Sequence, residues 1–456
     1  MSVVILAAGQ GSRMKSNLPK VLHTLADKSL LGHVLETSKK LNAEKTCVVI
    51  GHGAKKVKTA FAGAGLLWVE QQEQKGTGHA VQQALPQLQD EDTVLVLYGD
   101  VPLTRQQTLQ NLIEVVDDST VGLLTVTLAD ATGYGRIVRD AQNQVSRIVE
   151  QKDASAEEQQ ICEVNTGILA IKALHLKNLL SAIGCDNAQG EYYLTDIFAL
   201  ARKQGLAIAT TSPEEEHEVV GVNNRRQLAE LERIHQREIA DQLLDEGVTL
   251  RDPTRLDVRG RLQVGRDVMI DVNVLFEGEV ILADGVQIGA NCVIRNTKIG
   301  TGTVIKENSV IDQSEVASEC VIGPFARLRP GTQLSTDVHV GNFVELKNSI
   351  VAPHSKINHL SYVGDSDIGS RVNIGAGTIT CNYDGANKHR TVIGDDVFVG
   401  SDTQLVAPVT VERGVTIGAG TTVTENIEAG MLVISRVKQK VIGGWQRPKK
   451  PLKKEN

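Results

Sequence analysis

The sequence predicts an α/β domain followed by a parallel β-helix, and three observations lead to this prediction. Strand-like segments alternate with helical segments over the first 225 residues. From residue 258 to residue 433 an aliphatic side chain returns about every six positions. Between these two regions lies one charged segment with a helical pattern. We therefore expect domains at 1–225 and 247–456, joined by a helical linker at 226–246.

The first domain is expected to contain a mostly parallel sheet. Short apolar runs predict strands at residues 3–7, 47–50, 66–69 and 94–98. Helices are expected between them, since apolar residues recur at helical spacing after Leu30, after Gly53 and from Gly76. Ligands of such sheets bind at the carboxyl ends of the strands.

A glycine-rich loop follows the first strand. Gly9 and Gly11 can bring backbone amides close to phosphate oxygens, and Arg13 and Lys20 add positive charge. Met14 stands where a Walker A loop or a dinucleotide-binding fingerprint requires glycine, so neither motif is present. A phosphate-binding loop and a plain glycine-rich turn both remain compatible with these residues.

Tyr98, Gly99 and Asp100 close another buried-type strand. A carboxylate in this position can hold a hard cation whose coordination is completed by phosphates. An aspartate after a strand is also a common turn former. The spacing alone does not decide between the two interpretations.

The six-residue period predicts a β-helix. Neither a helix nor an alternating strand produces this spacing, and a β-sandwich would alternate by two. Each hexad is expected to form a short strand and a turn with its aliphatic residue inward, which gives about ten coils for three hexads per coil. The first aliphatic positions are Val258, Val264, Ile270, Phe276, Leu282, Ile288 and Ile294.

The period is interrupted at residues 346–368 and again at 380–390. We expect the chain to leave the regular stack there, the second segment as an extruded polar loop, and loops on rigid scaffolds often carry chemistry. His359 lies in the first interruption and is a candidate general base, because histidine titrates near neutral pH. A surface histidine without function is the alternative.

Composition excludes several classes of protein. The net charge of −7 gives no reason to expect nucleic acid as a partner. No apolar run is long enough to span a membrane, and no secretory signal precedes the first strand. The six cysteines are scattered without metal-binding spacing, so we expect reduced thiols and a cytoplasmic location.

Two charged segments complete the chain. Residues 225–246 predict a surface helix that is either an arm between the domains or the last helix of the first domain. Residues 436–454 carry eight basic side chains and no acidic one. We expect them to cap the coil and, near Arg436, to supply positive charge for a bound phosphate rather than to bind nucleic acid.

Together these motifs resemble known families. The first domain resembles the sugar-1-phosphate nucleotidyltransferases, and the hexads resemble the hexapeptide-repeat acyltransferases, whose coil is left-handed and whose members are usually trimers. The whole chain is similar to the bacterial bifunctional N-acetylglucosamine-1-phosphate uridylyltransferase/glucosamine-1-phosphate N-acetyltransferase family. The matching segments of the first domain are 6–14, 19–20, 71, 76–80, 98–100, 133–136, 150–152, 165–167, 190–196 and 221–224.

The resemblance implies a Rossmann-like nucleotidyltransferase domain that transfers uridylyl from UTP to N-acetylglucosamine 1-phosphate. It assigns Arg13 and Lys20 to catalysis on the phosphates, and Asp100 and Asn223 to Mg²⁺. Sequence spacing alone would not identify Asn223 as a metal ligand, because an asparagine in this position is ordinarily a helix cap. The implied residues around UTP and UDP-N-acetylglucosamine are Leu6, Ala7, Ala8, Gly9, Lys20, Gln71, Gly76, Thr77, Tyr98, Gly99, Asp100, Gly135, Glu150, Asn165 and Asn223.

For the β-helix the resemblance implies acetyl transfer from acetyl-CoA to glucosamine 1-phosphate, with His359 as the base. It gives Arg329, Lys347, Tyr362 and Asn373 to the sugar phosphate. The residues implied for acetyl-CoA, in a channel between subunits of a homotrimer, are Ala376, Asn382, Tyr383, Ser401, Ala419 and Arg436.

The product would be the precursor of bacterial peptidoglycan and lipopolysaccharide. The sequence departs from the family pattern at Gln10, where relatives often carry lysine, and at His389 and Arg390. Two other hypotheses are a nucleotidyltransferase whose β-helix is purely structural or regulatory, and a non-catalytic assembly subunit. The second predicts degraded phosphate and metal residues, whereas all four of these are in place, namely Arg13, Lys20, Asp100 and Asn223.

Overall fold

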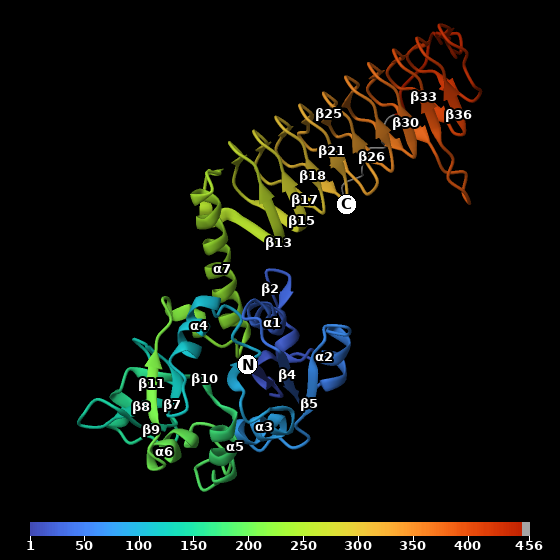
Figure 1. Cartoon of the computed structure of the whole chain (residues 1–456). Coiled ribbons are helices and arrows are strands. Elements are labelled where there is room, and N and C mark those ends of the chain that lie inside the picture. Colours follow the sequence, from blue (N-terminus) through green and yellow to red (C-terminus); the bar gives the residue numbers. More distant parts are fainter. Residues whose placement is uncertain (449–456) are drawn as a thin grey trace, which may run out of the picture. The chain divides into compact units, whose positions relative to one another are not determined.

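The computed structural model describes residues 1–448 and divides into two compact units, Met1–Glu238 and the part that begins at Ile239. Figure 1 shows an α/β unit and a coiled, strand-rich unit. No helix within residues 1–448 is long and apolar enough to cross a membrane.

The first unit is built on a nine-stranded sheet whose main path runs β11-β7-β10-β6-β1-β4-β5. β1 pairs in parallel with β4 and β6, and β4 pairs in parallel with β5, whereas β10 is antiparallel to both β6 and β7. The strands are β1 (Ser2–Ala7), β4 (Lys45–Ile50), β5 (Leu67–Glu70), β6 (Thr93–Tyr98), β7 (Thr120–Thr127), β8 (Arg136–Arg139), β9 (Val145–Val149), β10 (Glu163–Lys172) and β11 (Ala207–Thr211).

Helices follow the strands and cover both faces of this sheet (Figure 1). Alternating residues of β1 divide between the two cores: Val4 packs into one and Val3 and Ile5 into the other. The helices are α1 (Leu30–Lys40), α2 (Ala54–Ala60), α3 (Thr77–Ala84), α4 (Gln106–Glu114), α5 (Ala173–Ser181) and α6 (Asp196–Lys203).

This topology brings three loops to one edge of the sheet. The glycine-rich loop follows β1, Gly99 and Asp100 follow β6, and Gln71 follows β5. Because the three strands are parallel, their carboxyl ends lie at the same edge. The predicted α/β domain is therefore confirmed, but the sheet is mixed rather than mostly parallel, because β10 and the pair β8 and β9 join it in antiparallel fashion.

The charged helical stretch forms one helix, α7 (Arg225–Asp245), which crosses the boundary between the units. Leu231 is buried in a cluster of the first unit with Met14 and Leu30. Ala240 and Leu243 are buried in the core of the second unit. The helix thus contributes apolar side chains to both cores.

The second unit is a left-handed parallel β-helix, as the sequence predicts. One face is an 11-stranded parallel sheet in which Ile288, Ile305, Ile322 and Val340 stack directly in register. The strands of this face are β12 (Thr249–Leu250), β14 (Met269–Ile270), β16 (Gln287–Ile288), β19 (Val304–Ile305), β22 (Val321–Ile322), β25 (His339–Asn342), β28 (Lys356–His359), β31 (Asn373–Ile374), β34 (Phe398–Val399), β37 (Thr416–Ile417) and β39 (Leu432–Val433).

The remaining strands belong to a 17-stranded sheet that wraps around the coil. The aliphatic residues of its strands point inward and complete a continuous buried column. Its strands that carry or adjoin the residues implied for acetyl transfer are β23 (Arg327–Leu328), β26 (Glu345–Lys347), β27 (Ile350–Val351), β29 (Tyr362–Gly364), β30 (Ser366–Ile368), β32 (Ile379–Cys381) and β33 (Thr391–Ile393).

The prediction that the chain leaves the stack at 346–368 is wrong. Val351, Ile357 and Val363 are buried in the core, and β27, β28 and β29 continue the coil. The interval between successive inward-facing aliphatic residues is one residue shorter at two corners. A tighter corner of this kind shifts the six-residue count but does not end the stack. The predicted loop at 380–390 is confirmed, because most of residues 382–390 lie outside named strands and are exposed.

The corners of the coil use a left-handed backbone. Such positions favour glycine, asparagine and aspartate, and Asn291, Asn308 and Asp337 are examples here. Three corners instead carry large apolar residues at positive φ, namely Phe325 (55°), Phe343 (56°) and Leu360 (47°). All three are exposed, and the rings of the two phenylalanines stack with centroids 5.3 Å apart.

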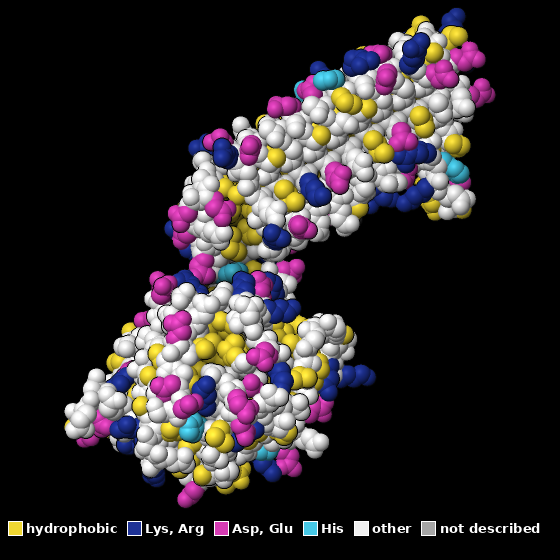
Figure 2. Space-filling view, viewed as in Figure 1, with side chains coloured by type: hydrophobic (Ala, Val, Ile, Leu, Met, Phe, Trp, Pro, Cys, Tyr) yellow, Lys and Arg dark blue, Asp and Glu magenta, His cyan; other side chains and the backbone are white. Residues whose placement is uncertain are grey.

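Figure 2 shows acidic and basic side chains interspersed over the visible surface. The visible face therefore carries no large field of one sign, in agreement with the modest net charge.

Candidate functional sites

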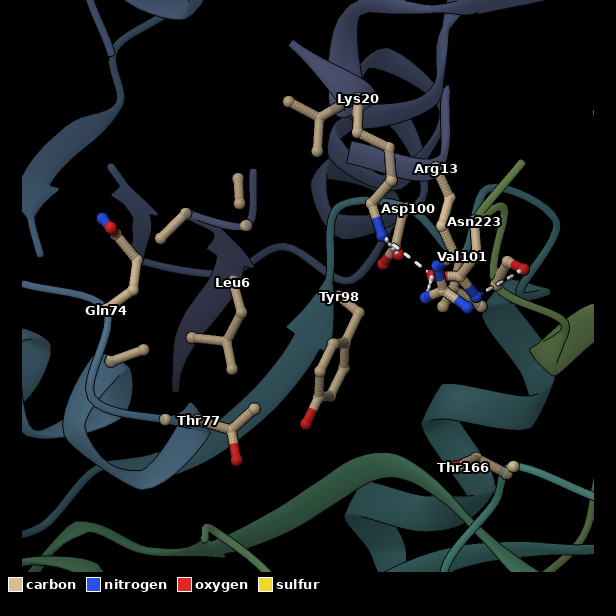
Figure 3. A pocket seen from close by; sticks show the side chains of 18 of the residues that line it. Leu6, Arg13, Lys20, Gln74, Thr77, Tyr98, Asp100, Val101, Thr166 and Asn223 are labelled. Atoms are coloured by element: carbon tan, nitrogen blue, oxygen red, sulfur yellow. Dashed lines mark hydrogen bonds and ion pairs between the residues drawn. The ribbon is translucent and has the colours of Figure 1, made fainter. Parts of the chain in front are cut away.

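A cavity of about 540 Å³ opens at the carboxyl edge of the first unit's sheet. Figure 3 shows side chains from β1, from β6 and from the loops around them converging on it. Sequence-predicted residues that line the cavity are Leu6, Ala7, Ala8, Gly9, Arg13, Lys20, Gln71, Gly76, Thr77, Tyr98, Asp100 and Asn223.

One end of the cavity is polar and charged. The Lys20 ammonium contacts Asp100 Oδ2 and lies 3.2 Å from Asn223 Oδ1 (Figure 3). Arg13 donates to the same Asn223 oxygen at 3.0 Å. Two cationic side chains and two acceptor oxygens, from residues distant in sequence, thus meet in one place.

These oxygens fit a divalent cation. Asp100 Oδ2 and Asn223 Oδ1 already converge on one positive charge, the Lys20 ammonium. Carboxylate and amide oxygens are ligands that Mg²⁺ accepts. Residues 1–448 contain no cluster of three acidic, histidine or cysteine ligands, so phosphate or water oxygens would have to complete the coordination.

The glycine-rich loop is shaped by its contact with Lys20. Gly11 has φ of 62°, and a Cβ on this residue would lie 2.7 Å from Lys20 Cβ. The lysine stem can therefore cross the loop only because position 11 is glycine. The loop thereby directs the ammonium toward Asp100.

Tyr98 forms part of the cavity wall. Burial, with the nearby carboxylates of Glu150 and Asp100, raises the pKa of Tyr98, so its hydroxyl stays neutral and keeps its proton to donate. Gly167 has φ of 85°, and a Cβ there would lie 2.5 Å from Tyr98 Cε2. A side chain at position 167 would displace the ring.

Four predicted residues do not line the cavity itself, namely Gly99, Gly135, Glu150 and Asn165. The backbone N–H of Asn165 donates to the Gly135 carbonyl at 2.8 Å. This bond joins the two segments directly beside the cavity residues Tyr134 and Thr166. Burial raises the pKa of Glu150, while a hydrogen bond from Thr195 acts against this shift.

In the second unit the predicted basic residues share a corner of the coil. Lys347 ends β26 and Arg329 directly follows the neighbouring β23. The close ammonium of Lys388, from the extruded loop, lowers the pKa of Lys347. Sequence reasoning missed Lys388, and it missed Glu345, which binds Arg329 at 2.8 Å. Their proximity depends on the loop and the coil register, which have no short-range signal.

Tyr362 and Asn382 meet over the next coil at this corner. A Cβ on Gly364 would lie 2.4 Å from the Tyr362 hydroxyl oxygen and 2.9 Å from Asn382 Nδ2. Burial tends to raise the pKa of Asp365, but hydrogen bonds from Asn348 and Asn382 outweigh it and lower this pKa. The structure thus brings polar groups from several coils to one corner.

His359 ends β28 on a different face, and its side chain is exposed. Its Nδ1 lies 3.1 Å from Asn342 Oδ1. In the neutral ring, a proton on Nδ1 can be donated to that oxygen, and Nε2 then carries the lone pair. The geometry suits a general base whose ring orientation is fixed by Asn342.

The remaining predicted residues of the second unit follow the sheet that holds His359. Asn373 lies in β31, and Ala376, Ser401 and Ala419 lie just after β31, β34 and β37. Arg436 and Tyr383 are exposed. His359 and the basic corner therefore belong to two different sheets of the coil. Lys449, Lys450, Lys453 and Lys454 of the basic tail lie outside the described residues.

Comparison with known proteins first defines the class. Residues 3–162 match the MobA-like NTP transferase domain, residues 258–360 the GMPPB C-terminal domain, and residues 390–425 six bacterial transferase hexapeptide repeats. An NTP transferase domain is thus followed by transferase hexapeptide repeats.

Curated relatives then give the family. The bifunctional protein GlmU of Azoarcus sp. is 60% identical over 99% of this chain and 100% of its own. Those of Burkholderia multivorans and Marinobacter nauticus are 59% and 58% identical, each over 99% of both chains. The chain belongs to the family of bifunctional GlmU proteins. A nucleotidyl transferase structure from Methanothermobacter thermautotroptrophicus covers 54% of the chain and 98% of its own at 19% identity and a TM-score of 0.38, too distant to inform function.

Proposed function

We propose that the protein transfers acetyl from acetyl-CoA to glucosamine 1-phosphate and then uridylyl from UTP to the N-acetylglucosamine 1-phosphate formed. The observation that carries the first domain's part is the meeting of Lys20, Arg13, Asp100 and Asn223 at one end of the cavity. Membership in a family of bifunctional proteins supports two activities on one chain.

In uridylyl transfer the main task is to hold two polyanions together. Arg13 and Lys20 would bind the phosphates and stabilise the charge that develops on them. Asp100 and Asn223 would hold Mg²⁺, which neutralises phosphate charge when bound. Binding of the nucleotide requires Lys20 to exchange its present partner Asp100 for a phosphate oxygen.

In acetyl transfer His359 Nε2 would take a proton from the sugar amine as the amine attacks the thioester carbonyl. The C–S bond then breaks, and CoA leaves as a thiol after its sulfur takes up a proton. Arg329, Lys347 and Lys388 would bind the sugar phosphate, because their charges gather at one corner. Tyr362 and Asn373 are proposed beside the sugar. Ala376, Asn382, Tyr383, Ser401, Ala419 and Arg436 are proposed beside acetyl-CoA.

We further propose a homotrimer in which each acetyltransferase site is completed by a neighbouring subunit. Phe325, Phe343 and Leu360 support this proposal, because large apolar residues rarely occupy exposed left-handed corners. Leu360 adjoins His359, and Phe343 adjoins its partner Asn342. An interface on these corners would cover the candidate base.

The domain boundaries at 1–225, 226–246 and 247–456 remain a proposal, supported by the apolar residues that α7 contributes to both cores. We place the reactions in the cytoplasm, since UTP and acetyl-CoA are intracellular metabolites and all six cysteines are free. The product would serve the synthesis of peptidoglycan and lipopolysaccharide.

Two assays on the purified chain test the proposed function. Thiol release from acetyl-CoA on addition of glucosamine 1-phosphate, without UTP, reports the acetyltransferase. Pyrophosphate release from UTP with N-acetylglucosamine 1-phosphate and Mg²⁺ reports the uridylyltransferase. Pyrophosphate release without any thiol release would leave a uridylyltransferase on a purely structural β-helix and contradict half of the proposal.

A further inference from the structure

The two oxygens proposed to hold a metal ion come from segments that are distant in sequence. Asp100 follows β6 and leads toward α4, whereas Asn223 lies between β11 and α7, shortly after the 3-10 helix η5 (Glu216–Val219). The two main chains touch where the Val222 N–H donates to the Asp100 carbonyl at 2.8 Å. The separation of the two metal-binding side chains therefore depends on what holds these segments against each other.

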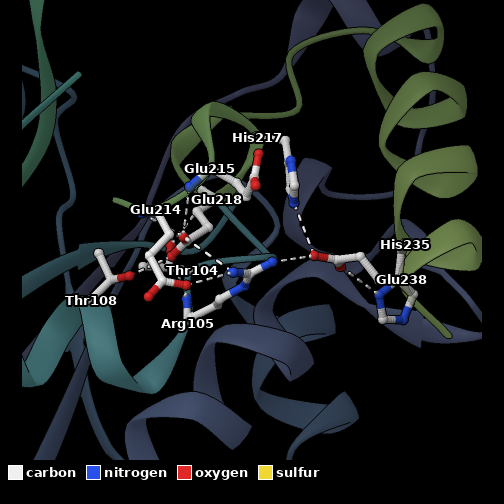
Figure 4. A network of polar contacts seen from close by, with 9 residues as sticks. All are labelled: Thr104, Arg105, Thr108, Glu214, Glu215, His217, Glu218, His235 and Glu238. Carbon is white, nitrogen blue, oxygen red and sulfur yellow. Dashed lines mark hydrogen bonds and ion pairs between the residues drawn. The ribbon is translucent and has the colours of Figure 1, made fainter. Parts of the chain in front are cut away.

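Glu218 in η5 joins the two segments with one carboxylate. Its side chain is fully buried. Oε1 accepts from the backbone N–H groups of Glu214 and Glu215 at 3.1 and 3.2 Å, on its own segment. Oε2 accepts from the Arg105 backbone N–H at 3.2 Å and from the Thr108 hydroxyl at 2.5 Å, both on the segment that follows β6 (Figure 4). Each of these two sets of bonds thus uses a different oxygen.

Burial makes this arrangement rigid. Thr104 adds a bond from its hydroxyl to the Glu218 carbonyl at 2.9 Å, and the Arg105 guanidinium lies 4.0 Å from Oε1. A buried carboxylate is stable only while its oxygens have donors, since water cannot replace a lost partner there. A shift of one segment relative to the other would break the bonds to one of the two oxygens. Glu218 therefore fixes the spacing of the two segments.

Buried residues carry this spacing from η5 to the metal-binding side chains. Val219 and Val222 are buried on one segment, and Val101 is buried next to Asp100 on the other. A Cβ on Gly221 would lie 3.7 Å from Val101 Cγ2 and 3.8 Å from Asp100 Oδ2, so the two segments are in close contact there. Neither segment can move at the cavity without disturbing the packing around η5.

We propose that Glu218 is a positioning residue that holds the oxygens of Asp100 and Asn223 at the separation a divalent cation requires. This inference rests on the proposed uridylyl transfer and extends it, because it names a residue outside the cavity that sets the geometry of the metal site. Side chains that orient metal ligands without touching the metal typically change metal affinity about 10- to 100-fold when they are replaced. A purely structural residue would leave metal affinity unchanged in a folded chain.

Binding of Mn²⁺ to the full chain in the presence of UTP tests this role, with the electron paramagnetic resonance signal of free Mn²⁺ as the readout and UTP alone as the blank. Glu218→Gln keeps the size of the side chain but turns one acceptor oxygen into an NH₂ group that faces donors. The Kd for Mn²⁺ should rise about tenfold. Pyrophosphate release should return to within about threefold of the original rate at saturating Mg²⁺, because mass action restores the lost binding.

Asp92→Asn is the matched control. Asp92 is also a buried carboxyl that accepts a backbone N–H, that of Gln89 at 3.1 Å, and a hydroxyl, that of Ser2 at 2.7 Å. It directly precedes β6, whereas Asp100 follows this strand, so the two aspartates lie at opposite ends of it. The replacement of Asp92 should therefore leave the Kd for Mn²⁺ unchanged.

Thr108→Val removes one donor from the Glu218 carboxylate and should raise the Kd about threefold, which gives a second reading if Glu218→Gln does not fold. A cooperative urea transition shows that a variant is folded. An unchanged Kd in whichever of the two variants folds, or an equal rise in Asp92→Asn, would overturn the proposal. An original protein that binds no Mn²⁺ with UTP present would instead refute the proposed metal site, so the two failures are distinct.

Discussion

At the scale of single residues, the Lys20 ammonium lies in the cavity at the place where a metal ion is proposed to bind. Lys20 touches both Asp100 and Asn223. The same lysine is proposed to bind phosphate, so it would exchange one anionic partner for another when nucleotide enters. A residue with two such roles should be sensitive to truncation.

Lys20→Ala should lower kcat/KM for UTP at least about 100-fold, because one preorganised charge on the transferred phosphate is lost. Pyrophosphate release measures this effect. Lys28→Ala serves as the control, since Lys28 pairs with Glu36 away from the cavity and its loss should change the rate little. A tenfold or smaller effect of Lys20→Ala would contradict the phosphate role.

His359→Ala should lower thiol release from acetyl-CoA between about 100-fold and 10,000-fold while pyrophosphate release is unchanged, because only acetyl transfer is proposed to need this base. His354→Ala is the matched variant. His354 lies on the same coil and is exposed, but its Nδ1 bonds Asp337 at 2.8 Å. Equal losses in the two variants would argue against His359 as the base.

At the scale of elements, α7 is fastened to the first unit by a polar network (Figure 4). Glu238 accepts from Arg105 at 2.8 Å and from His217 at 3.0 Å, and His235 also faces it. Burial alone would raise the pKa of Glu238, but these hydrogen bonds outweigh it and lower the pKa to about 2. The fully buried Glu218 holds the Arg105 amide and the Thr108 hydroxyl.

The lowered pKa predicts a dependence of stability on pH. The contribution of ionised Glu238 is fully present above its ordinary pKa of 4.5 and is lost as the pH falls toward about 2. At pH 7 Glu238→Gln should lower the free energy of unfolding by about 1 kcal/mol, a small value because the side chain is partly exposed.

Urea unfolding of the full chain, followed at pH 7 and pH 4, measures this difference. The gap between the original protein and Glu238→Gln should narrow at the lower pH. Glu214→Gln is the control, because Glu214 also contacts Arg105 but is largely exposed, and it should have little effect. A gap that widens as the pH falls would contradict the network's role.

At the scale of the whole molecule, the residues proposed for acetyl transfer come from both sheets of the coil, with His359 at the end of β28 and Lys347 at the end of β26. The proposed homotrimer would add residues of a neighbouring subunit to this site. The exposed corner residues Phe325, Phe343 and Leu360 offer an apolar surface for that neighbour.

Phe343→Asp should reduce the mass measured by light scattering from three times that of the 49.2 kDa chain toward that of one chain. A charge in an apolar contact is costly to bury, so the subunits should separate. Thiol release should fall with the mass, whereas pyrophosphate release should persist. Leu174→Asp on α5, an exposed apolar residue of the first unit, should change neither, and an unchanged mass in Phe343→Asp would contradict this interface.

Short-range patterns in the sequence determined both domains of the fold. The period of six in residues such as Ile288 and Ile305 can bury a side chain only in a coil, and the alternation of strand and helix admits only a layered sheet. The glycine-rich loop and Asp100 could likewise be found as candidates, because each follows a strand. Their assignment to UTP came from the resemblance to a family.

Tertiary structure alone decided which distant residues meet. Asn223 reaches Lys20 across 203 positions of sequence, and Lys388 approaches Lys347 from the extruded loop. The sequence pattern also failed to predict the continuous coil at 346–368, because a corner that is one residue shorter looks like an interruption of the six-residue period. Contacts set by packing and coil register have no local signature, since the energy that favours them is shared over the whole core.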